Sequence, residues 1–166
     1  MVWFYNTDSG RKLSSSFRVR FNDYLETNQQ SWSTRISPQY RFSNKFTINY
    51  SLDLEITKED RGYVTDNGVD VVFGDRDILE VENQLQLNYN FNTTHALSLN
   101  FRHFWTTVQY KNRFLDLLDN GEVQPSNSDI GFNPDTNFNI WNLDLSYNWQ
   151  FAPASQAIFI ISKFHL

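Results

Sequence analysis

The stretch that decides the fold is residues 46–57, FTINYSLDLEIT, in which apolar and polar residues alternate without interruption. Its even positions are Phe, Ile, Tyr, Leu, Leu and Ile, and its odd positions are Thr, Asn, Ser, Asp, Glu and Thr. Because successive side chains of a β-strand point to opposite faces, this segment has one apolar face and one polar face.

Two further segments repeat the pattern. Residues 79–91, LEVENQLQLNYNF, keep it with the single exception of Asn83, and residues 141–151, WNLDLSYNWQF, keep it throughout. Strands of globular proteins usually run about 5 or 6 residues, whereas about 9 to 11 are needed to cross a bilayer at a tilt. The sequence therefore predicts an all-β protein, an antiparallel up-and-down transmembrane β-barrel or part of one.

Composition agrees with a barrel and excludes other classes. The chain of 166 residues is long enough for one domain, so we expect a single barrel segment over residues 1–166 with no separate soluble domain. A mean hydropathy of −0.55 fits a barrel, because half of each strand faces a polar interior. Aromatic residues make up 17%, enough for girdles at both membrane interfaces. The absence of cysteine excludes thiolate metal sites, and the net charge of −5 argues against nucleic-acid binding.

About eight strands are expected, and the connections between them alternate in length. The expected strands are residues 2–7, 13–25, 31–42, 46–57, 78–91, 96–110, 138–151 and 156–162. Short turns at one end alternate with connections at the other that include the long segments Lys58–Asp77 and Lys111–Asn137. Outer-membrane barrels have short periplasmic turns and longer extracellular loops, so the long connections are expected outside the cell.

This layout places the start of the first strand and the end of the last strand on the extracellular side. Bacterial barrels normally keep both termini in the periplasm, so we expect at least one further strand at each end. Residues 1–10 contain neither a charged segment nor an apolar segment of a signal peptide. The expected partners are therefore outer-membrane lipid and the remaining strands of a longer barrel.

Ten charged residues fall on the predicted polar face. If that face lines an open pore, they select solutes by charge; if the interior is narrow, they fill it as a salt-bridge network. The second interpretation is favoured, because small barrels are filled by side chains. The residues are Arg18, Arg20, Arg35, Arg41, Asp53, Glu55, Glu80, Glu82, Arg102 and Asp144.

Aromatic residues on the apolar face are expected to anchor the strands at the membrane interfaces. They are Trp32, Tyr40, Tyr50, Tyr89, Trp105, Tyr147 and Trp149. His103 shares a face with Trp105, which suggests an interfacial position. No G-x-S-x-G nucleophile motif occurs, so we expect no enzymatic activity, no cofactor and no metal. The two long, acidic connections are expected to be solvated surface, where Phe114 and Phe132 could stack on a glycan or peptide.

Several strings resemble the C-terminal barrel of a Gram-negative family whose longer members carry an N-terminal carbohydrate-binding module of the family-nine type. The strings are residues 72–77 (VFGDRD), 99–105 (LNFRHFW), 108–111 (VQYK), 118–121 (LDNG) and 141–155 (WNLDLSYNWQFAPAS). The resemblance covers about residues 70–160. It implies an outer-membrane location and a role in glycan or nutrient handling, and it supplies no catalytic residues. The module is absent here, and the family continues into a further hairpin beyond Phe159, so a premature end or a split gene is expected.

Soluble folds are the alternatives. An eight-stranded lipocalin-like barrel would point the apolar faces inward at a small hydrophobic ligand, although the Gly-x-Trp signature of lipocalins does not occur. A two-sheet binding module should have shorter strands separated by more glycine and proline than the 6 Gly and 4 Pro present.

Overall fold

The computed structural model describes residues 1–25, 28–66, 71–118, 120–126 and 130–165. These residues form one antiparallel sheet and contain no helix that is long and apolar enough to cross a membrane. The strands are β1 (Val2–Asn6), β2 (Leu13–Tyr24), β3 (Gln29–Ser43), β4 (Phe46–Asp66), β5 (Val71–Asn90), β6 (His95–Leu117), β7 (Val123–Pro125), β8 (Thr136–Ala152) and β9 (Ser155–His165).

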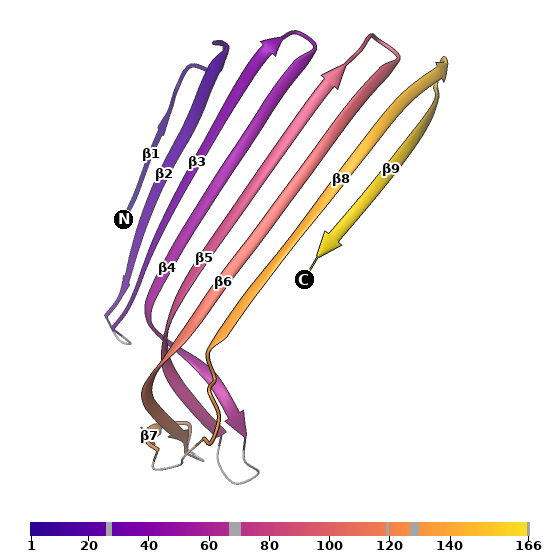
Figure 1. Cartoon of the computed structure of the whole chain (residues 1–166). Helices are drawn as coiled ribbons and strands as arrows, with labels where there is room; N and C mark the ends of the chain where they lie inside the picture. The colour runs from indigo at the N-terminus through magenta and orange to yellow at the C-terminus, as the bar shows by residue number, and fades with distance from the viewer. Residues whose placement is uncertain (26–27, 67–70, 119, 127–129, 166) are drawn as a thin grey trace.

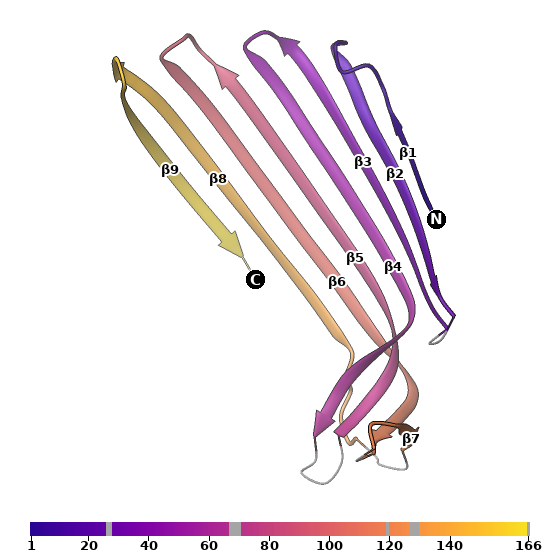
Figure 2. The same ribbon diagram turned by 180° about the vertical axis from the view of Figure 1, so that it is seen from behind.

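The sheet is an up-and-down meander in which each long strand pairs with its neighbour in the chain. The order is β1-β2-β3-β4-β5-β6-β8-β9, and the short β7 pairs with β6. Figures 1 and 2 show the tight turns at one end of the sheet and the longer hairpins at the other. In the described residues β1 and β9 are unpaired edges, so the sheet is open and compatible with part of a barrel.

The predicted all-β, antiparallel, up-and-down fold is confirmed, and each expected strand is present. The alternating segments also pair in phase: Leu54 lies opposite Val81, and Leu87 lies opposite Leu99, which in turn lies opposite Leu145. Because paired residues share a face, the apolar side chains of neighbouring strands gather on one surface.

The prediction of two long loops was wrong for most of residues 58–77 and for residues 111–117, 123–125 and 136–137 of the second connection. β4 continues to Asp66, β5 already begins at Val71, and β6 continues to Leu117 before the short β7. β-Bulges between Thr57 and Asp60, Tyr63 and Thr65, and Gly74 and Arg76 shift the phase of the strands. Each bulge breaks the alternation on which the prediction relied. Residues 67–70, 119 and 127–129 of these connections, including Asp119 of the 118–121 string, lie outside the described residues.

The ends of β4, β5 and β6 beyond these bulges, together with β7, twist away from the main sheet (Figure 1). We call residues 58–66, 71–77, 109–118 and 123–125 the twisted extension. It holds the most deeply buried side chains of the described chain, with Val72 1% and Asp75 3% exposed. The main sheet is a single layer with exposed apolar side chains, among them Trp32 at 52% and Ile161 at 69%. Such a face needs a covering layer of protein or lipid.

Two opposed glycines let the extension pack closely. Gly62 and Gly74 are paired across β4 and β5. A Cβ atom on Gly62 would lie 2.1 Å from Cζ of Arg76, and one on Gly74 would lie 2.7 Å from Cδ1 of Tyr110. The Arg76 guanidinium and the Tyr110 ring thus lie directly on bare backbone.

The substitution Gly74→Ala tests this packing. We expect it to destabilise the extension by about 1–3 kcal/mol, because the Tyr110 ring and Val64 must move to admit the methyl group. The measurement is amide hydrogen exchange of residues 58–66 and 71–77. Gly10→Ala is the control, since its Cβ would meet only the Asp8 side chain, at 3.2 Å, in an exposed turn. Unchanged protection in Gly74→Ala would contradict the close packing.

Candidate functional site

The charged residues of the predicted polar face lie on one face of the sheet. One row runs from Arg18 to Arg35, Asp53 and Glu82, each residue being the partner of the next across neighbouring strands. The others fall in register with it: Arg20, Glu55 and Glu80 one row away, and Arg41, Arg102 and Asp144 nearer the short turns.

Only some of these charges neutralise one another. Arg35 pairs with Asp53, and Arg102 Nε lies 2.6 Å from Glu82 Oε1. Asp144 Oδ2 accepts a hydrogen bond of 3.2 Å from the Asn142 amide. The remaining residues form no ion pair within 4.0 Å in the part of the chain that the structure describes; they are Arg18, Arg20, Arg41, Glu55 and Glu80. The polar face is thus not a fully paired salt-bridge network.

The two signs of charge occupy different strands. Arg18, Arg20, Arg35 and Arg41 lie on β2 and β3, whereas Asp53, Glu55, Glu80 and Glu82 lie on β4 and β5. A groove of about 500 Å³ on the arginine side is lined by Arg18, Arg20 and Arg35 and by the hydroxyls of Ser16 and Ser37. A solute on this face would therefore meet a positive and a negative wall side by side.

The aromatic residues singled out from the sequence lie on the opposite, apolar face. Tyr40, Tyr89, Tyr147 and Trp149 lie toward the short turns, whereas Trp32 and Trp105 lie toward the long hairpins and Tyr50 lies between the two groups. In the first group, the His95 ring stacks near Tyr147 and Trp149, with centroids 5.9 and 6.0 Å away. His95 Nδ1 is also within 2.6 Å of the Tyr147 hydroxyl.

A hydrogen-bonded chain crosses the apolar face through His103. The Tyr50 hydroxyl donates to Asn83 Oδ1 at 2.7 Å, and the Asn83 amide lies 3.4 Å from His103 Nδ1. His103 Nε2 lies 2.9 Å from Asn139 Oδ1. The tautomer with its proton on Nε2 accepts from the Asn83 amide at Nδ1 and donates to Asn139 Oδ1. Asn83, the one exception to the alternation of residues 79–91, is therefore not left without partners on an apolar surface.

A second charged cluster, missed from the sequence, lies in the twisted extension. Asp75 is buried and bridges Arg61 Nε at 3.0 Å and Arg113 Nη1 at 3.1 Å. Arg76 Nε donates to Asp60 Oδ2 at 2.6 Å, and its Nη1 donates to the Tyr110 hydroxyl at 3.0 Å. The expectation of solvated loop charges is thus corrected for four acids of this segment, because strand pairing brings them against bases of β4, β5 and β6. They are Glu59, Asp60, Asp75 and Asp77. The mixed charges of residues 72–77, together with Gly74, were the sequence signal that could have indicated this cluster.

Lys111 joins two carboxylates of this cluster. It pairs with Glu59 and lies 3.1 Å from Asp77, which also accepts from Lys58 at 2.7 Å. The hydrogen bond to Glu59 raises the pKa of Lys111. Burial alone would raise the pKa of Asp77, but the bonds from Lys58 and Lys111 outweigh it, so this pKa is lowered.

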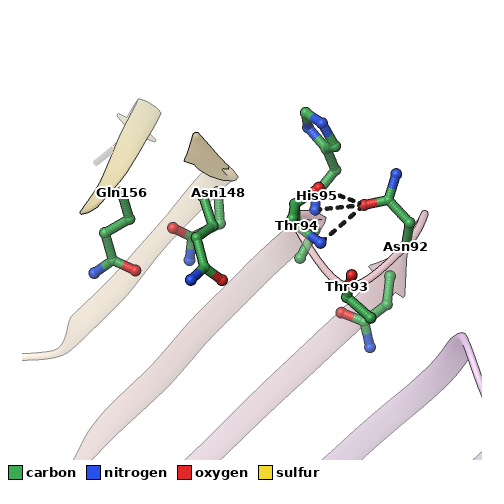
Figure 3. Close-up of a pocket in the computed structure, with 9 residues that line it drawn as sticks. Asn92, Thr93, Thr94, His95, Asn148 and Gln156 are labelled. Atoms are coloured by element: carbon green, nitrogen blue, oxygen red, sulfur yellow. Dashed lines mark hydrogen bonds between the residues drawn. The ribbon is translucent and has the colours of Figure 1, made fainter. Parts of the chain in front are cut away.

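A small polar recess lies at the short-turn end, between the β5–β6 turn and the β8–β9 turn (Figure 3). Its volume is about 180 Å³, and its lining includes Asn90, Asn148, Gln150 and Gln156. Asn92 Oδ1 shapes the turn by accepting from the Thr94 and His95 amides, both at 2.9 Å. The His95 ring points away from the recess in Figure 3. The lining offers hydrogen-bond donors and acceptors and no charge.

No group of three or more His, Cys, Asp or Glu side chains suited to a metal ion occurs among the described residues. The prediction that the chain has no enzymatic activity stays a prediction.

The lowered pKa of Asp77 gives the extension an acid sensitivity. A depressed pKa means stability that is present above the unfolded value, about 4, and is lost as the pH falls through the folded value. Because the ion pairs of Asp77 with Lys58 and Lys111 are partly exposed, we expect Asp77→Asn to lower the free energy of unfolding of the extension by about 1 kcal/mol or less at neutral pH. The variant should also lose less stability than the unsubstituted protein as the pH falls. The loss of stability with falling pH is measured by amide NMR of the extension between pH 7 and 2 in detergent micelles. Asp8→Asn, which loses an exposed pair with Arg11 at 3.8 Å, is the matched control. An equal response in both variants would contradict the role of Asp77.

Comparison with known proteins gives one match. No curated protein and no solved structure is significantly similar to the chain. The sequence model of the family DUF5916, described as a domain of unknown function, matches residues 1–163. That description names neither a membrane location nor a carbohydrate-binding module, so both stay predictions. Since the match covers nearly the whole chain, the protein belongs to the DUF5916 family.

Proposed function

We propose that this chain is a membrane-spanning segment of an outer-membrane β-barrel, with its polar face toward the interior and its apolar face toward lipid. The observation that carries this proposal is the shape of the apolar surface. It is a belt whose borders are displaced along the strands between β4 and β8.

Toward the long hairpins, the border of this belt is level from β2 to β5, where Phe21, Trp32, Ile56 and Leu79 share one row, and it then moves on β6 and β8. On β5 the last apolar residue is Leu79, and Asp77 follows it on the same face. On β6 the last is Trp105, opposite Val81, and on β8 it is Trp141, opposite His103. Each step moves the border two residues toward the short turns.

The border at the short turns moves in the same direction. On β4 it lies at Phe46, which is opposite Tyr89, and the row continues through Leu97 to Tyr147 on β8. The apolar face of β8 runs beyond this row to Phe151. Both borders are therefore shifted in the same direction on β8 relative to β4.

A bilayer produces this pattern when strands cross it at a tilt. At about 40° and a strand spacing of about 4.8 Å, the membrane plane shifts by about 4 Å, roughly one residue, per strand. Because only alternate residues face the belt, an average shift of one residue per strand appears as a step of two residues at about every second strand. The two steps over the five pairings from β2 to β8 are of this order. From Leu79 to Tyr89 the strand rises about 33 Å, or about 25 Å along the membrane normal, the height of the apolar band in outer-membrane barrels.

Polar groups within the belt support the same interpretation. Asn83 and His103 lie between apolar residues of β5 and β6 and are hydrogen-bonded to Tyr50 and Asn139. Lipid offers no hydrogen-bond partners, so polar groups facing it have to satisfy one another.

In the intact protein, the proposed role is that of a non-enzymatic surface receptor or transport-type barrel. The open edges β1 and β9 would pair with further strands. The twisted extension would stand on the extracellular side, where a glycan or peptide could bind, in line with the glycan link implied by the family resemblance. The soluble lipocalin-like barrel is the competing arrangement, in which the apolar face is enclosed by protein.

Tryptophan fluorescence separates the two arrangements, because all 5 tryptophans of the chain lie on the apolar face. After refolding into vesicles, we expect brominated lipid chains to quench most of the emission. Omission of lipid should give aggregation. A folded, monomeric and unquenched protein in buffer would contradict the proposal and support the lipocalin-like barrel.

A pair of arginine substitutions on adjacent residues tests which face meets lipid. Leu85→Arg places a charge near the middle of the belt and should destabilise the inserted protein by about 2–4 kcal/mol. Gln86→Arg, on the polar face, should change stability little. Urea titration of vesicle-inserted protein measures both, and equal destabilisation would show that neither face lies in lipid.

A further inference from the structure

We propose that the polar wall formed by β2 and β3 binds oxyanions, that is, ligands with carboxylate or phosphate groups, in the groove at Arg18 and Arg20. This inference deepens the proposed function and rests on it, because it names a ligand class for the interior face.

The wall is made of hydrogen-bond donors without a single carboxylate. Besides Arg18, Arg20, Arg35 and Arg41, the polar-face residues of β2 and β3 are serines, amides and Tyr24. The chain as a whole has a net charge of −5, so this segregation is not a consequence of composition. An anion on this wall meets Arg18 and Arg20 with no competing carboxylate among the polar-face residues of the same two strands.

The groove concentrates this charge. Arg18 and Arg35 are directly opposed across β2 and β3, and Arg20 follows two residues along β2 on the same face. Side chains of like charge in opposed positions repel each other. Asp53 neutralises Arg35 only, and no carboxylate lines the groove of about 500 Å³. An anion between these side chains would remove the remaining repulsion.

The guanidinium groups have free donors for such a ligand. Arg18 and Arg20 make no side-chain hydrogen bond or ion pair with any described residue, whereas Arg35 is held in place by Asp53. A guanidinium donates two parallel hydrogen bonds to a carboxylate or phosphate. The hydroxyls of Ser16 and Ser37, which also line the groove, can donate to the remaining oxygens.

The acidic strands confine the anion to this wall. Glu55 and Glu80 are partners on β4 and β5, and Ser33 separates Glu55 from Arg20 in the same row. Two strand spacings, about 9.6 Å, therefore lie between the arginine and the nearer glutamate. Val2 and Phe4 border the groove on the other side and could contact an apolar part of the ligand.

Calorimetric titration of the full chain in detergent micelles tests the inference at about 0.15 M ionic strength, where exposed charges are largely screened. Pyrophosphate and citrate are the probes, and their relative affinities distinguish a phosphate from a carboxylate ligand. We expect saturable binding of at least one probe. The double variant Arg18→Gln/Arg20→Gln should weaken it at least tenfold.

Two matched variants make the outcome decisive. Arg11→Gln/Lys12→Gln removes the same charge from an exposed turn outside the groove and should leave the affinity within about twofold. Glu55→Gln/Glu80→Gln should leave binding unchanged or tighten it. Equal weakening in the turn variant, or no saturable binding of either probe, would overturn the site. Bilayer insertion is scored separately by tryptophan quenching, so insertion without binding defeats only the anion site, and binding without insertion defeats the membrane proposal.

Discussion

The structure depends on one constraint, the in-phase pairing of neighbouring strands. A register shift of one residue would move every apolar side chain of a strand to the polar face. In the alternating segments of β2 to β8 the ladder avoids this, so that Phe17, Ile36 and Leu52 share one row and one face. The separation into an apolar and a polar face is a property of the whole sheet. Each strand adds to it only because its register with the neighbouring strands places its apolar residues on the same face as theirs.

Two chemically opposite surfaces follow from this pairing. The apolar side is a single layer that nothing in the described chain covers, whereas the polar side carries arginines on β2 and β3 and acids on β4 and β5. The displaced borders of the apolar belt link the two sides, because a strand tilt that suits a bilayer also curves a sheet toward a barrel. In our interpretation, the lipid-facing exterior and the charged interior thus both result from the in-phase pairing of the strands.

The twisted extension follows different rules. There the bulges end the strict alternation, and stability comes from ion pairs such as Asp75 with Arg61 and Arg113, and from Tyr110 packed on Gly74. Mixed charge on both faces is typical of a segment that stands in water. Near Thr57 and Asp77 the alternation of apolar and polar residues gives way to residues that form salt bridges. In our interpretation, the membrane-facing part of the sheet ends there.

The sequence by itself determined the long alternating strands, their order and the face of each alternating residue, because the two-residue period of a strand is a local property that side-chain chemistry exposes directly. It could not show that residues 58–66 and 71–77 remain paired, since a bulge destroys the local period while long-range pairing persists. The sequence placed the charged residues on one face, but it could not show which of them form ion pairs with one another. Arg35 finds Asp53 while Arg18 and Arg20 find no carboxylate, and only the register between distant strands decides that difference.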